Sequence, residues 1–330
     1  MEITRSHRRL EHFHLRQPAC DRFQRWPVET GLQVSIAKAT GDAVELPRPF
    51  FWFDAAWHSL AIEQAENLAK EMAAGGIVVA ALHRDLSQSD DSDASTFPLR
   101  MAPHRCDRAG WSYRDCQSAA IIELRMMPSR DSSGRFAYHT TQLARWRNRD
   151  PNESTDEDQG DAMTFPPDWQ SLDDMAVKVV QLRRLSDAAI FVSFDTSARA
   201  HMLPAALAAG VDGVIAIVDG DPVETITRCR EMIAQSQSTH PPALWIATKQ
   251  RISPEDAVKC FALGASGLAV DALCDDYLAN GSRAEMYVGP WSQRVRGLAR
   301  SCGVDRLTSL RAEHLIPSAA AGAVDFARKA

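Results

Sequence analysis

The chain lacks several features that would assign it to a particular class of protein. Its 330 residues hold no C-x-x-C pair and no His or Cys spacing typical of a metal site. No stretch approaches eighteen uninterrupted apolar residues, and the first residues lack the apolar core of a signal peptide. We therefore expect a soluble cytoplasmic protein with no membrane partner, no metal site and no disulfide framework.

Basic charge is also scarce. The chain has 37 Lys and Arg residues against 43 Asp and Glu residues, which gives a net charge of −6. Because nucleic-acid phosphates are bound through an excess of basic residues, we expect no nucleic-acid partner. The basic cluster RSHRRLEHFHLRQ near the start is interpreted as a solvated or docking arm.

The cysteines are scattered, which is typical of reduced thiols in a cytosolic protein rather than of disulfides. The acidic run DPNESTDEDQGD from Asp150 lacks the alternating ligand spacing of a calcium loop, so it is interpreted as an exposed loop. The cysteines are Cys20, Cys106, Cys116, Cys229, Cys260, Cys274 and Cys302.

The chain does contain a series of short apolar runs, each followed by helix-like sequence. Strands of a parallel sheet that is covered on both faces appear as continuous apolar runs. The pattern predicts an α/β fold, a (β/α)8 TIM barrel, whose chemistry would lie on the loops that follow the strands. The predicted strands are PFFWF from Pro49, IVVAAL from Ile77, AAIIELRM from Ala119, IFVSF from Ile190, GVIAIV from Gly213, ALWIA from Ala243 and GLAV from Gly267.

The chain divides into three predicted parts. Residues 1–48 are an N-terminal arm that includes one helix, and residues 49–281 are the barrel. Residues 282–330 are a C-terminal extension with two short helices joined by a turn at Gly303. Within the barrel, one helix is predicted to begin after a capping serine, Ser253, with Pro254 at its first position and Gly264 at its end.

Several segments resemble the FMN-binding domain of the glutamate synthase family, which is a (β/α)8 barrel. AIIELRMMPSRDSSGRF resembles its I-E-I-K strand and the glycine-rich loop that follows, and AALAAGVDGVIAIVDGD resembles its Gly-Ala-Asp, strand and D-G unit. PEDAVKCFALGASGLAV resembles its last helix and strand, and the resemblance extends from about Pro49 to Leu315. It implies a barrel that binds FMN and an iron–sulfur cluster and reduces a 2-iminoglutarate-like substrate.

The positions that bind the FMN phosphate in the family carry other residues here. The family's Gly-Gly pair is replaced by Lys249 and Gln250, and a Gly-Thr pair after the last strand is replaced by Val270-Asp271. Both changes oppose phosphate binding through backbone N–H groups. Lys249 and Arg251 would compensate for some of the lost interaction through their positive charge. The candidate cofactor-binding residues are therefore Lys249, Gln250, Arg251 and Asp271.

Other elements of the family's site are altered as well. The lysine of I-E-I-K is Arg125, and the lysine expected in the IFVSF strand is Ser193. The family's D-G-x-x-G-G-T-G loop keeps only Asp219, Gly220 and Asp221. Cys274 stands alone where the family has a cysteine cluster, so no iron–sulfur cluster is expected.

The candidate catalytic residues are Glu123, Arg125, Asp195 and Asp219. Each also has a structural interpretation. Glu123 would pair with Arg125 or with Arg199, Asp195 would cap the helix that follows it, and Asp219 would belong to an ordinary turn. The capping interpretation is favoured for Asp195.

Three hypotheses about function follow from this comparison. The favoured hypothesis is a degenerate barrel that acts as a binding or regulatory module for a small-molecule ligand or a protein partner, because several site elements are altered at once. The alternative is an FMN-dependent oxidoreductase of the glutamate synthase type. A third hypothesis is that Lys249 and Arg251 bind an unrelated phosphate ligand. The sequence leaves the oligomeric state open.

Overall fold

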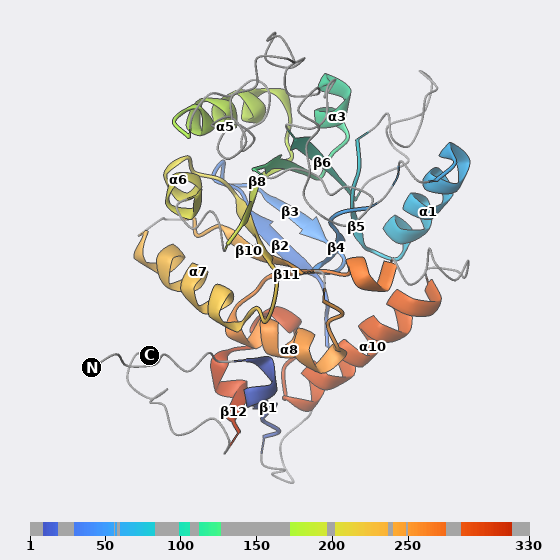
Figure 1. Ribbon diagram of the computed structural model, residues 1–330, viewed down its shortest axis with the longest axis vertical. Helices are drawn as coiled ribbons and strands as arrows, with labels where there is room; N and C mark the ends of the chain where they lie inside the picture. The colour runs from blue at the N-terminus through green and yellow to red at the C-terminus, as the bar shows by residue number, and fades with distance from the viewer. Residues whose placement is uncertain are drawn as a thin grey trace, which may run out of the picture.

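Eight parallel strands close into a barrel, which confirms the predicted TIM-barrel fold (Figure 1). The computed structural model describes residues 9–18, 30–55, 57, 60–82, 99–105, 112–126, 172–196, 202–236, 240–248, 250–274 and 285–318. Around the barrel the strands follow chain order, and the last pairs with the first. They are β4 (Phe50–Trp52), β5 (Val78–Ala80), β6 (Arg100–Arg105), β7 (Ile121–Arg125), β8 (Ala189–Asp195), β9 (Gly213–Val218), β10 (Ala243–Thr248) and β11 (Gly267–Ala269).

Strand β6 is the one barrel strand that the sequence did not predict. Its sequence, RMAPHR, mixes basic residues with a proline and does not form an apolar run. Its central residues Met101 and Ala102 are nevertheless fully buried, and it pairs with both β5 and β7. The strand is therefore specified by its neighbours in the barrel rather than by its own apolar pattern.

Aromatic rings fill the lower part of the barrel interior. The ring centroid of Trp245 lies 4.6 Å from that of Phe51 and 4.9 Å from that of Phe191. Two glycines make room for these rings, because a Cβ at Gly213 would lie 2.2 Å from the Phe191 ring and one at Gly267 would lie 2.6 Å from Trp245. Close packing of this kind leaves no space for any other residue at either glycine.

A β-hairpin closes the barrel at the amino ends of the strands. Its residues Ile36 and Leu46 are buried in the same interior cluster as the aromatic rings. The Ala39 N–H donates to Asp212 Oδ1 at 2.8 Å, and Asp212 immediately precedes β9. The predicted arm of residues 1–48 was expected to hold a helix, but its described residues form strands and one 3-10 turn. The hairpin strands are β2 (Val34–Ala37) and β3 (Ala43–Leu46).

Helices surround the barrel and bury their apolar faces against its outer surface (Figure 1). The signals predicted for α8 are confirmed, since Ser253 Oγ accepts from the Asp256 N–H at 3.1 Å and Gly264 ends the helix at φ 112°. The α-helices are α1 (Ile62–Ala74), α3 (Tyr113–Gln117), α5 (Asp174–Leu185), α6 (Met202–Ala208), α7 (Val223–Gln235), α8 (Pro254–Leu263) and α10 (Glu285–Ser301).

The two ends of the described chain meet beside α8. Strand β1 (Phe13–Leu15) pairs antiparallel with β12 (Leu315–Pro317), and the 3-10 turn η1 (Leu10–His12) precedes β1. The predicted turn at Gly303 is present, but the elements on either side of it are not two short helices. The structure has one long helix, α10, followed by the 3-10 turns η5 (Leu307–Ser309) and η6 (Ala312–His314), because Gly303 at φ 81° turns the chain out of the helix.

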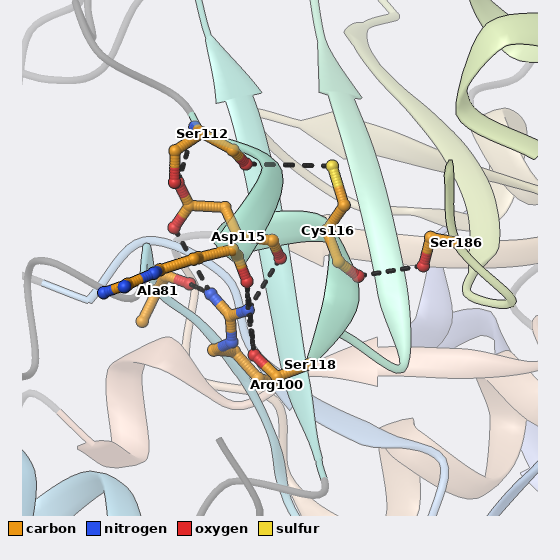
Figure 2. A network of polar contacts seen from close by, with 8 residues as sticks. Ala81, Arg100, Ser112, Asp115, Cys116, Ser118 and Ser186 are labelled. Atoms are coloured by element: carbon orange, nitrogen blue, oxygen red, sulfur yellow. Dashed lines mark hydrogen bonds and ion pairs between the residues drawn. The ribbon is translucent and has the colours of Figure 1, made fainter. Parts of the chain in front are cut away.

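A buried ion pair joins β6 to α3, and Arg100 also bonds to the residue that follows β5 (Figure 2). The Arg100 guanidinium lies 3.5 Å from Asp115 Oδ1 and donates to Ala81 O and Asp115 O. The Asp115 carboxylate also accepts from the N–H and hydroxyl of Ser112. Burial lowers the pKa of Arg100, and Asp115 opposes this effect. The network provides hydrogen-bond partners for the Ser112 N–H and the Asp115 carbonyl of α3 and its N-cap. It is a structural feature of the barrel wall.

Candidate functional site

The predicted site residues that the structure describes lie in or directly after the carboxyl-terminal parts of the barrel strands. Along β7, Ile121 belongs to the interior cluster, so the alternation of a strand also directs Glu123 and Arg125 inward. The Ser193 hydroxyl of β8 donates to Glu123 Oε1, which joins the two neighbouring strands. The strands therefore bring Glu123, Arg125 and Ser193 together.

Arg125 is enclosed by acceptors on several sides. Its Nε and Nη2 donate to the two Glu123 oxygens at 2.8 and 2.9 Å, and its Nη1 donates to Asp54 Oδ1 at 3.2 Å. The guanidinium also lies over the Phe53 ring, 4.0 Å from its centroid. Arg125 is 2% exposed and Glu123 is 0% exposed. The pairing with Arg125 that the sequence left open for Glu123 is present, and Arg199 lies outside the described residues.

Asp271 follows β11 and faces the loop that follows β4. Its Oδ2 accepts from the Phe53 N–H at 3.0 Å, and its Oδ1 accepts from the Asp54 N–H at 2.6 Å. Two successive backbone N–H groups that point to one anion form a typical anion-binding arrangement. Here the anion is the protein's own carboxylate.

A second carboxylate occupies the loop after β9. Asp221 Oδ1 accepts from the Val223 N–H at the start of α7 at 3.0 Å, and Oδ2 accepts from the Leu10 N–H of the N-terminal arm at 2.6 Å. Asp219, which was the predicted site residue of this loop, is exposed. Asp221, rather than the predicted Asp219, is therefore the aspartate of this loop that accepts hydrogen bonds from the Val223 and Leu10 N–H groups.

The remaining predicted residues are more dispersed. Asp195 is the last residue of β8, and residues 197–201 between it and the described part of α6 lie outside the described residues, so its capping role stays a prediction. Gln250 and Arg251 are exposed after β10, and the Gln250 N–H donates to Thr248 Oγ1 at 3.1 Å. Lys249 lies outside the described residues.

Sequence reasoning missed Phe53, Asp54 and Asp221. Phe53 and Asp54 directly follow the apolar run of β4, so they stand where barrel loops carry functional groups. Asp221 stands two residues before Val223, a spacing that allows a carboxylate to accept from the first N–H groups of a helix. Their places in the sequence, directly after a strand or just before a helix, were the features that could have identified these three residues.

Backbone N–H groups at two places in the described part of the mouth are already bonded to carboxylates. The donors of Phe53 and Asp54 are taken by Asp271, and the Val223 donor is taken by Asp221. A phosphate at either place would meet a carboxylate in its own position, with like charges at short distance. These three N–H groups could receive a phosphate only if the two carboxylates moved away.

The described cysteines are buried and form no disulfide with one another, and burial raises the pKa of Cys116 and of Cys229 to about 11. Cys20 and Cys106 lie outside the described residues. Among the residues that the structure describes, no group of three or more His, Cys, Asp or Glu side chains could hold a metal ion. None of the helices in these described ranges is long and apolar enough to cross a bilayer.

Comparison with known proteins shows what the fold resembles. No family model and no curated protein matches the chain. Mandelate oxidase with benzoyl-formic acid aligns with a TM-score of 0.60 at 15% identity, covering 93% of this chain and 86% of that one. A mandelate oxidase variant with (S)-mandelic acid aligns with a TM-score of 0.58 at 14% identity, with coverages of 93% and 86%. At this identity the likeness shows the fold, which is a TIM barrel similar to that of mandelate oxidase.

Proposed function

We propose that this chain is a TIM barrel that acts as a binding or regulatory module and does not hold FMN. The observation that supports the proposal most directly is Asp271, whose carboxylate takes the N–H groups of Phe53 and Asp54 at the barrel mouth. The Glu123–Arg125 pair supports it further, because both side chains are buried and bonded to neighbouring protein groups. A side chain that already has protein partners on several sides must leave them before it can bind a substrate.

The alternative is a flavin-dependent oxidoreductase, and two observations favour it. The solved structures with a similar fold include an oxidase with a bound 2-oxo acid and a bound 2-hydroxy acid. Glu123 and Arg125 also keep the charges of the I-E-I-K strand in the resembling family. On this hypothesis FMN would supply the redox chemistry, and Arg125 would contribute a positive charge to the site that holds it.

An FMN titration distinguishes the two hypotheses. We expect freshly purified protein to be colourless. In the titration we expect no saturable quenching of the FMN fluorescence, even at concentrations about 100-fold above the low micromolar range. Saturable binding in the low micromolar range, about −8 kcal/mol, would contradict the proposal.

A matched pair of variants tests the reason given for the absence of FMN. Asp271→Ser removes the carboxylate that occupies the two N–H groups, whereas Asp219→Ser removes an exposed carboxylate of the same mouth. We expect a free carboxylate such as formate to stabilise Asp271→Ser against thermal unfolding and to leave Asp219→Ser unchanged. Equal shifts in the two variants would show that the N–H groups of Phe53 and Asp54 do not form an anion site.

A further inference from the structure

Helix α5 exposes apolar side chains on its outward face. Val177 is 58% exposed and Val180 is 52% exposed, although the opposite face of the same helix buries Met175, Val179 and Leu182 against the barrel. Helix α3 packs beside α5 (Figure 1). Of the five large apolar side chains that the described ranges expose, four lie on these two helices, namely Tyr113, Val177, Val180 and Leu185. Exposed apolar side chains that gather on one side of a protein indicate an interaction surface.

Two charged side chains extend the apolar pair of α5 into a stripe. Asp173 directly precedes the helix, Arg184 lies in its last turn, and both are exposed. Positions 173, 177, 180 and 184 are spaced by four, three and four residues, so they follow one line along the outer face of the helix. Within the described part of the chain, neither Asp173 nor Arg184 has an ion-pair partner. This α5 stripe therefore has a negative end, an apolar middle and a positive end.

The α5 stripe is complementary to itself. When two copies of the helix cross antiparallel about a two-fold axis midway between positions 178 and 179, position 173 of each copy meets position 184 of the other, and position 177 meets position 180. Asp173 then lies opposite Arg184 at both ends, with the valines in contact between them. The amino end of each helix also faces the carboxyl end of the other helix, which is favourable for the helix dipoles. The pattern of charge on the stripe thus fits a second copy of the same stripe.

We propose that the α5 stripe binds a second copy of this chain and forms a two-fold symmetric dimer. A two-fold interface uses the same patch on both copies, as the exchange of positions 173 and 184 requires. The helix has 12 residues and is about 18 Å long, so two paired stripes fall short of the roughly 800 Å² per partner of a stable interface. The dimer is therefore weak. It does not depend on what the barrel mouth binds, so it goes beyond the proposed function.

Sedimentation velocity of the full-length protein over a range of concentrations tests the proposal. We expect a monomer–dimer equilibrium with a Kd on the order of 100 μM. Asp173→Arg and Arg184→Asp should each weaken it about tenfold, because the symmetry then brings like charges together at both ends of the helix pair. Arg228→Asp, which makes the same change of charge at an exposed position of α7, should leave the equilibrium unchanged.

Combining the two changes separates pairing from an effect on the helix itself. The variant that carries both Asp173→Arg and Arg184→Asp brings opposite charges together again, so its Kd should lie within about threefold of the wild-type value. If the single changes acted only through the helix dipole, this double variant would be the most impaired protein. A mixture of the two single variants should form a heterodimer more tightly than either variant pairs with itself, because one stripe is then positive at both ends and the other is negative.

Three results would overturn the proposal. A protein that stays monomeric at concentrations about fivefold above the expected Kd would leave the stripe to another occupant. The proposal would also fail if both single variants dimerised like the wild-type protein, or if the double variant dimerised as weakly as the single ones. The outcome can be separated from that of the FMN titration, because sedimentation of flavin-free protein reports only the association of its copies. If FMN binds while the charge changes control dimerisation, the proposed function fails and the dimer stands.

Discussion

The Glu123–Arg125 pair is the residue-scale feature on which the function of the mouth depends. A buried ion pair costs desolvation, and its attraction repays that cost only when further hydrogen bonds satisfy both groups. Here Ser193, Asp54 and the Phe53 carbonyl provide those bonds. The pair is therefore best understood as part of the interior packing, and we expect its loss to affect stability.

Glu123→Gln should lower the free energy of unfolding by about 3 kcal/mol, because Arg125 would keep its charge in a buried position with a weaker partner. Urea denaturation measures the change, and Glu45→Gln, which alters an exposed glutamate of β3, serves as the control. A loss for Glu123→Gln no larger than that for Glu45→Gln would show that the pair contributes nothing to stability.

Some residues of the site were predictable from the sequence, and others were not. Glu123, Arg125 and Asp271 were identified because they align with positions of the resembling family's I-E-I-K strand and of the Gly-Thr pair after its last strand. Asp54 and Asp221 were missed because their importance depends on N–H groups and side chains far away in the chain, such as those of Leu10 and Arg125. No local pattern records such contacts.

At the scale of elements, the β2–β3 hairpin determines how the barrel is closed at its amino end. Ile36 is 1% exposed and packs in the interior cluster with Phe191 and Trp245. Ile36→Ala should therefore destabilise the protein by about 2–5 kcal/mol through lost burial and the cavity left behind. The neighbouring Ser35→Ala, on the exposed face of the same strand, should change thermal stability little. Similar melting temperatures for the two variants would mean that the hairpin does not close the interior.

The elements differed in how far the sequence predicted them. Strands β8 to β11 were predicted because each is covered on both faces and is continuously apolar. The hairpin was not, because Val34 and Ile36 alternate with exposed residues over only four positions, which is too short a pattern to separate from a loop. The length of α10 was missed because Pro290 and Gly297 interrupt its helical signal.

At the scale of the whole molecule, the buried thiols make stability depend on pH. Burial raises the pKa of Cys116 and of Cys229 to about 11, from an ordinary value near 9.0. When the pH is below the ordinary pKa, the thiols are neutral in both the folded and the unfolded chain, so the stability of the folded protein is not reduced by their ionisation. Between pH 9 and 11 only the unfolded chain ionises, so stability falls as the pH rises, by roughly 2 kcal/mol per thiol.

Cys229→Ala tests this dependence. The variant should lose less stability than the wild-type protein between pH 8 and pH 10.5, even if it is less stable at pH 8. Urea unfolding at the two pH values gives the two losses, and the comparison within each protein removes the cost of the smaller side chain. Equal losses for the variant and the wild-type protein would show that the Cys229 thiol ionises normally in the folded state.

The pairing of β1 with β12 has a consequence for the order in which the chain folds. The two strands are separated by almost the whole sequence, so β1 meets its partner only after residues 315–317 have been synthesised. Closing so long a loop is entropically costly before the intervening barrel has formed. We therefore expect the barrel strands to assemble before β1 pairs with β12.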